Sequence, residues 1–139
     1  MAKWLKISHT GELRYVDLPG GGPGNTIPLL SAFERELNCE WIEFVRARWF
    51  CETGLCLIID ECGKLKDDVK ERVNHCASLM YAPGFDCIVG DVILGQYMMY
   101  PDGEYIVPLD LGKYNEIVEC LLRIFSDLKF VGGEENARV

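Results

Sequence analysis

Apolar and polar residues alternate with a period of two along much of the chain, which is the pattern of half-buried β-strands. The first such segments are Lys3–Ile7 and Leu13–Leu18, and Thr10-Gly11 between them predicts a turn. Alternation or short apolar runs predict further strands at residues 40–50, 55–60, 85–100 and 104–107. Because Gly90-Asp91 and Gly95 interrupt the strand at 85–100, we expect bulges or a sharply curved sheet.

Other segments carry apolar residues at helical spacing. They predict helices at residues 25–37, 67–80 and 111–128. Asp67 stands at the start of the second helix, where a carboxylate can accept hydrogen bonds from free backbone N–H groups, and the third helix is predicted to start after Asp110. Asn38 is a fair terminator of the first helix. The apolar stripe of that helix is predicted at Leu30, Phe33 and Leu37.

The order of these elements predicts an α+β fold with a mainly antiparallel, curved sheet and two or three helices. Residues 1–131 are expected to form a single domain, and the polar residues 132–139 a flexible C-terminal tail. Prolines and glycines dominate residues 19–24, and no Gly-x-x-x-x-Gly-Lys-Ser/Thr pattern follows. We therefore interpret that stretch as a flexible connector rather than an anion-binding loop.

The composition narrows the range of partners. The 139 residues carry a formal net charge of −8, which repels nucleic-acid phosphates, so general nucleic-acid binding is disfavoured. Either the charge serves solubility, or an acidic face docks on a basic protein. No apolar run reaches the roughly 18 residues of a membrane helix, and no signal peptide is evident at the N-terminus. We expect no membrane contact and a location in the host cytoplasm.

Cysteines and histidines offer little chemistry. The seven cysteines are an odd number without an export signal, which favours reduced thiols. No Cys-x-x-Cys pair occurs, so we predict neither a metal site nor another cofactor. His75 and Cys76 point about 100° apart on a helix, and no nucleophile–base pair is indicated for His9 either. No catalytic residue is predicted, and an enzyme is the weakest functional hypothesis.

The strand at 40–50 carries the most suggestive side chains. One face is predicted to present Trp41 and Trp49, and the other Arg46 and Arg48. Guanidinium groups bind phosphate through paired hydrogen bonds and stack on aromatic rings, so these residues could bind a nucleotide-like ligand. The simpler interpretation pairs the arginines across strands with acidic residues. The candidate acids are Glu43, Glu52 and Glu104.

Several segments, taken in their order along the chain, resemble the domain-of-unknown-function family 3846. They are Trp41-Ile42-Glu43, Leu57–Leu65, Arg72 with Asn74, and Asp86–Asp91. In that family a Tyr-Ile-Glu strand precedes an acidic-Gly-Lys hairpin, an Asn-Arg pair, an Ile-x-Gly strand and a C-terminal helix. The order matches over roughly residues 3 to 120, with tryptophan replacing the tyrosine and Arg72-Val73-Asn74 replacing the adjacent Asn-Arg pair.

The resemblance implies a small protein of a phage, plasmid or conjugative element, with no assigned reaction. We predict a non-enzymatic acidic binding protein that counters host defence by binding and inhibiting a host protein. One alternative is a protein that sequesters a small nucleotide signal at an arginine/aromatic pocket, and another is a small enzyme of unknown reaction. An exposed sheet edge is consistent with a homodimer or higher oligomer. The candidate ligand-binding residues are Arg46, Arg48, Arg72, Asn74, Trp41, Trp49 and Lys64.

Overall fold

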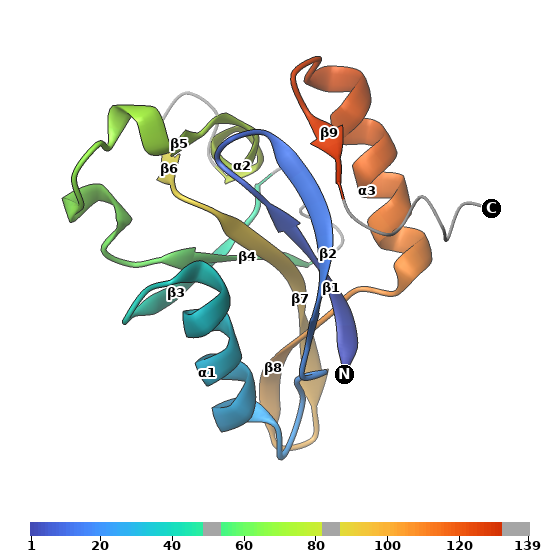
Figure 1. Ribbon diagram of the computed structural model, residues 1–139. Coiled ribbons are helices and arrows are strands. Elements are labelled where there is room, and N and C mark those ends of the chain that lie inside the picture. Colours follow the sequence, from blue (N-terminus) through green and yellow to red (C-terminus); the bar gives the residue numbers. More distant parts are fainter. Residues whose placement is uncertain (49–53, 82–86, 132–139) are drawn as a thin grey trace.

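A computed structural model describes residues 1–48, 54–81 and 87–131. The described residues build one mostly antiparallel sheet with helices on both faces, so the predicted α+β fold is confirmed (Figure 1). The helices are α1 (Thr26–Leu37), α2 (His75–Tyr81) and α3 (Leu111–Ile124). None of the helices in the described ranges is long and apolar enough to cross a membrane. The predicted tail at 132–139 lies outside the described residues.

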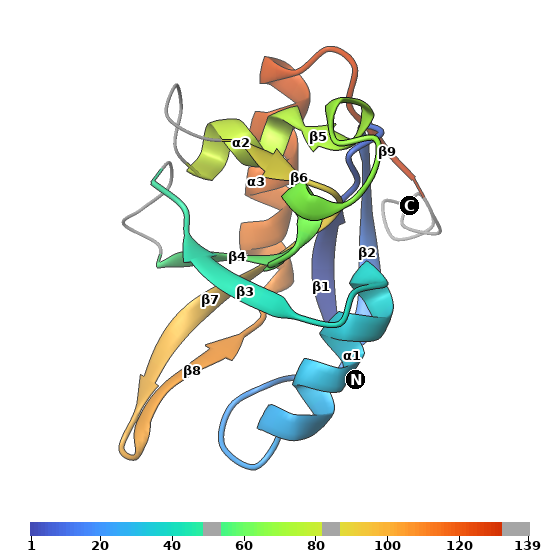
Figure 2. The same ribbon diagram turned by 90° about the vertical axis from the view of Figure 1, so that its left-hand side faces the viewer.

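The main sheet has the strand order β3-β4-β7-β1-β2-β9, and β8 pairs with β7. Its strands are β1 (Ala2–Ile7), β2 (Glu12–Leu18), β3 (Ile42–Arg46), β4 (Leu55–Asp60), β7 (Val92–Tyr100), β8 (Gly103–Val107) and β9 (Lys129–Phe130). The predicted hairpins β1–β2 and β3–β4 both form. The far ends of β7 and β8 extend away from the rest of the sheet as a hairpin (Figure 2).

Two apolar clusters fill the two sides of the sheet. On one side α1 covers the sheet, and Trp4 packs edge-on against Phe33 at 5.1 Å between ring centroids. On the other side α2 and α3 cover residues such as Leu57, with Tyr114 fully buried. All six residues of β4 are buried, which explains why that strand reads as a continuous apolar run.

Helix α1 ends where the sequence predicts, but its buried face differs. Asn38 adopts a left-handed conformation with φ of 52°, and its backbone N–H donates to the carbonyl of Arg35. The residues that α1 buries fully are Leu29, Ala32 and Phe33, so the predicted stripe is rotated by about one residue. Leu30, predicted in that stripe, is only half-buried.

The helix predicted over residues 67–80 is wrong. The segment divides into a 3-10 turn η3 (Lys70–Arg72), the short strand β5 (Val73–Asn74) and α2. The Asn74 side chain causes the break, because its Oδ1 accepts from Ala77 N at 3.0 Å and thereby starts α2 at His75. β5 pairs with β6 (Ile88–Val89), which completes a second, two-stranded sheet.

Two glycines act differently from the prediction. Gly95 lies inside a continuous β7, and a Cβ there would come within 2.6 Å of the Trp4 ring. Its role is therefore close packing, whereas the predicted break occurs at Gly90, whose φ is +92°. Gly63, predicted to need a positive φ, begins the 3-10 turn η2 (Gly63–Leu65) instead. A Cβ at Gly63 would lie 2.9 Å from the Val89 carbonyl oxygen, so close approach requires this glycine.

The end of the chain also departs from expectation. Helix α3 starts after Asp110 as predicted, and the Asp110 side chain accepts from Lys113 N at 3.0 Å. The helix ends at Ile124 rather than near Leu128. The following residues form β9, which pairs in parallel with β2. Such a two-residue strand carries no periodicity that the sequence could reveal.

Candidate functional site

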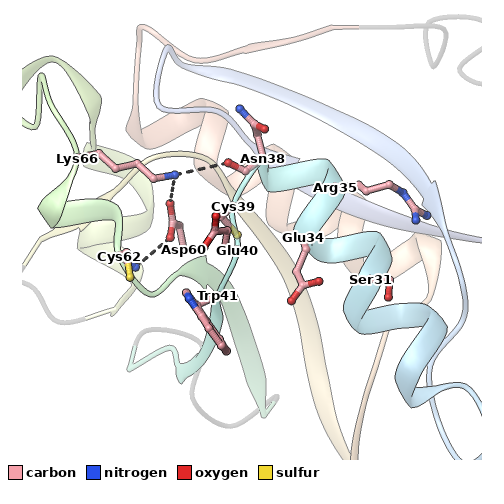
Figure 3. Close-up of a pocket in the computed structure, with 10 residues that line it drawn as sticks. All are labelled: Ser31, Glu34, Arg35, Asn38, Cys39, Glu40, Trp41, Asp60, Cys62 and Lys66. Atoms are coloured by element: carbon pink, nitrogen blue, oxygen red, sulfur yellow. Dashed lines mark hydrogen bonds and ion pairs between the residues drawn. The ribbon is translucent and has the colours of Figure 1, made fainter.

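An open groove lies between the C-terminal half of α1 and the ends of β3 and β4 (Figure 3). Its volume is about 700 Å³. We call it the Trp41 groove, and its lining residues are Ser31, Glu34, Arg35, Asn38, Cys39, Glu40, Trp41, Asp60, Cys62 and Lys66. The site is built by chain reversals, since Asn38 ends α1 just before β3 and Asp60 ends β4. The backbone N–H of Glu61 donates to the Trp41 carbonyl at 2.9 Å, which joins the ends of the two strands.

An ion pair between the buried Asp60 and the partly exposed Lys66 lines the Trp41 groove. The Asp60 side chain is 5% exposed, and its Oδ2 lies 2.6 Å from Lys66 Nζ. Asp60 Oδ1 accepts from the backbone N–H of Cys62 at 2.9 Å (Figure 3). Although Asp60 precedes a turn, its carboxylate is therefore not solvated. A buried carboxylate requires such compensation, because an unpaired charge is costly away from water.

Trp41 is 62% exposed, which is unusual for a large aromatic side chain. It comes from the segment before β3, while Glu34 comes from α1, on the other side of the groove (Figure 3). Glu40 also lines the groove, and within the described part of the chain neither Glu34 nor Glu40 forms an ion pair. We call Glu34 and Glu40 together the acidic wall. An indole ring and two carboxylates without ion-pair partners can together bind a cationic group.

The Cys39 thiol, which also lines the groove, has a raised pKa mainly because it is partly buried. Burial raises the pKa of Cys39, and the nearby carboxylates of Asp60 and Glu34 raise it further, while Lys66 opposes them. The thiol therefore stays protonated at neutral pH and is a poor nucleophile. The groove as a whole favours cations over anions.

A second hollow of about 350 Å³ shares Asn38 and Lys66 with the groove. We call it the Arg72 pocket, and its lining residues are His9, Leu37, Asn38, Lys66, Asp67, Arg72 and Asp91. The Nη1 atom of Arg72 is buried and has no hydrogen-bond acceptor. No ion pair among the described residues involves this guanidinium.

Asp91 joins a charged network at the edge of the Arg72 pocket. Its Oδ1 accepts from the backbone N–H of His9 at 3.0 Å and lies 2.8 Å from His9 Nδ1. Lys6 Nζ lies 3.7 Å from Asp91 Oδ2 and 2.8 Å from Glu36 Oε2. Burial alone would raise the pKa of Asp91, but the hydrogen bonds from His9 and the charge of Lys6 outweigh it, so the pKa is lowered. No local sequence pattern indicates this network, because His9 and Asp91 are 82 residues apart.

Arg46 already has an aromatic partner and an acidic partner within the protein. Its guanidinium carbon lies 3.8 Å from the centre of the Tyr97 ring, and Nη2 lies 3.1 Å from Glu104 Oε1. This matches the simpler of the two interpretations, cross-strand pairing with Glu104. Arg48 is exposed beyond the end of β3, and Trp49 and Glu52 lie outside the described residues.

The predicted ligand-binding residues do not converge on one site. Among the described residues, Trp41 lines the groove and Arg72 the neighbouring pocket, whereas Lys64 lines a separate hollow of about 210 Å³. Asn74 is 1% exposed and donates to the carbonyls of Ile7 at 3.0 Å and Gly90 at 2.9 Å, so its role is structural. No sequence pattern predicted that Lys66, Asn38 and the acidic wall belong to a site.

The buried thiols have low reactivity because they stay protonated at neutral pH. Burial raises the pKa of Cys56 and of Cys76 to about 12. Across the described ranges, no group of three or more His, Cys, Asp or Glu side chains is placed to hold a metal ion. The packing role predicted for Cys56 agrees with its complete burial in the cluster under α1.

Searches for related proteins found no family model that matches the chain, and no curated protein or solved structure with significant similarity. The resemblance to the domain-of-unknown-function family 3846 thus rests on the quoted segments and stays a prediction.

Proposed function

We propose that this protein is a non-enzymatic binding protein that docks on a basic segment of a host protein through the Trp41 groove. The observation that carries the proposal is the exposed Trp41 in a groove also lined by Glu34 and Glu40, two carboxylates that form no ion pair with the described residues. A net charge of −8 gives the whole surface the same preference for a basic partner.

The groove offers a basic side chain two kinds of contact. An arginine or lysine can lie on the Trp41 indole, where a cation–π contact contributes about 0.5–1 kcal/mol at an exposed site. Its charge can also pair with Glu34 or Glu40 across the groove. Tryptophan is among the residues that most often dominate the energy of an interface. Electrostatic attraction then increases the association rate and disfavours acidic partners.

The biological setting follows from the family resemblance. The resemblance implies a protein of a phage, plasmid or conjugative element without an assigned reaction, and inhibition of a defence protein is the role we propose. Binding alone is sufficient for such inhibition when the docked segment belongs to the active surface of the target.

Nucleotide binding at Arg46 and Arg48, the alternative function, has less support than docking in the Trp41 groove. Arg46 is held by Tyr97 and Glu104, and Arg48 shares no hollow with Arg72 among the described residues. A nucleotide bound at Arg46 would have to displace an existing ion pair. The enzyme alternative would depend on the His9–Asp91 contact, for which no substrate is indicated.

Capture from a bacterial lysate tests the docking proposal. Immobilised wild-type protein should retain one or a few basic proteins at low salt, and less at high salt because surface attraction is screened. Trp41→Ala should abolish that capture. Met99→Ala is the matched control, because Met99 is 72% exposed on the distant β7–β8 hairpin and its removal should change nothing. Identical capture by wild type and Trp41→Ala would contradict the proposal.

A further inference from the structure

Arg72 carries a charge that the described part of the protein leaves uncompensated. Its Nη1 is buried without an acceptor, and no carboxylate lies within ion-pair distance of the guanidinium. Leaving a buried charged donor unsatisfied costs more than an ordinary hydrogen bond contributes. A buried polar group without a partner in a native structure calls for an explanation, such as an ordered water or a bound ion.

The position of Arg72 is fixed by its backbone. Its carbonyl accepts from Gly90 N at 2.7 Å, and its N–H donates to Val69 O at 3.0 Å. The guanidinium lies against Gly90, where its Nη2 is 3.0 Å from the place a Cβ would occupy. A side chain larger than hydrogen at residue 90 would thus displace the guanidinium.

The surroundings of Arg72 supply further donors. Lys66 and Asn38 line the same pocket, and His9 lies on its wall. Two carboxylates line it as well. Asp91 is compensated by His9 and Lys6, whereas Asp67 is exposed and forms no ion pair with any described residue. Asp67 is therefore the group whose charge an incoming anion must overcome.

We propose that the Arg72 pocket binds the phosphate group of a small ligand, with Arg72 as its main contact and Lys66 and Asn38 as additional donors. Arg72 lines the pocket, and a guanidinium can bind one phosphate through two of its nitrogens. The pocket volume of about 350 Å³ accommodates a phosphate group. This inference goes beyond the docking function and does not depend on Trp41.

Amide NMR at constant ionic strength tests the phosphate site, with inorganic phosphate, AMP and adenosine as probes. Phosphate and AMP should produce saturable shifts of the Gly90 amide, and adenosine should not. Tighter binding of AMP than of phosphate would identify a nucleotide as the ligand class, and equal binding would identify free phosphate. Absence of a saturable shift with both phosphate probes would overturn the proposal.

Two substitutions of opposite effect sharpen the test. Arg72→Gln should weaken phosphate binding by about tenfold or more, because a charge-assisted contact is lost. Asp67→Asn should strengthen it severalfold, and this exposed position does not endanger folding. Trp41→Ala should leave phosphate binding unchanged, so failure here and failure of the docking proposal are separable. Unchanged or weaker binding in Asp67→Asn would contradict the site even if Arg72→Gln did not fold.

Discussion

At the scale of single residues, side chains in this protein take their roles from partners that the sequence does not bring near. Asp60 reads as a turn carboxylate, yet it is buried and pairs with Lys66. Asp91 reads as part of a glycine turn, yet it accepts two hydrogen bonds from His9. A local sequence pattern can predict whether a residue is in a strand, helix or turn. It cannot predict the residue's hydrogen-bond and ion-pair partners, because these depend on how distant strands align.

The Asp91 network makes a pH prediction. The lowered pKa of Asp91 lies below the value of about 3.9 in the unfolded chain, so ionised Asp91 stabilises the fold above that value. This contribution is lost as the pH falls through the lowered pKa of the folded state. Asp91→Asn should accordingly be less stable than wild type at pH 7, and the difference should shrink below about pH 4.

Urea denaturation of both proteins between pH 2 and pH 7 measures that difference. The other carboxylates are common to both proteins, so the difference isolates Asp91. A difference in the free energy of unfolding that stays constant over this range would contradict the assignment.

At the scale of elements, the sequence was sufficient to predict those helices, strands and hairpins that depend on a single local segment. The β1–β2 and β3–β4 hairpins and the start of α3 follow from alternation, turns and capping. The split of residues 67–80 and the parallel strand β9 could not be predicted, since both depend on contacts with distant strands. The same limit hid the Trp41 groove, whose two walls belong to separate elements, α1 and the β3–β4 ends.

Asn74 decides the arrangement of η3, β5 and α2, and replacing it tests this account. Asn74→Ala removes two donors to the carbonyls of Ile7 and Gly90 and the cap on Ala77. Buried partners left unsatisfied cost about 1–3 kcal/mol each, so we expect a loss of about 2–5 kcal/mol in the free energy of unfolding. Chemical denaturation measures it. Ser126→Ala, at an exposed position, is the control and should change stability by less than about 0.5 kcal/mol; a similarly small loss in Asn74→Ala would refute the role.

At the scale of the whole molecule, helices cover both faces of the sheet (Figure 1), and the Trp41 groove lies beside the C-terminal half of α1. The uncompensated acidic wall is concentrated there, while the arginine on β3 is neutralised by Glu104. Strand β3 lies at one end of the strand order, and an edge strand can pair with the same strand of a second copy. Formation of such a homodimer stays a prediction. Docking of a basic segment in the Trp41 groove is the central claim.

The most direct test compares two double variants with the same change in net charge. Glu34→Gln/Glu40→Gln removes the acidic wall of the groove, and Glu116→Gln/Glu119→Gln removes two exposed carboxylates from α3. Binding of a synthetic arginine–glycine peptide is measured at low and physiological salt. We predict that the groove variant loses about tenfold in affinity and the α3 variant less than about twofold. Equal losses in the two variants would show only general attraction between opposite charges and would contradict the docking groove.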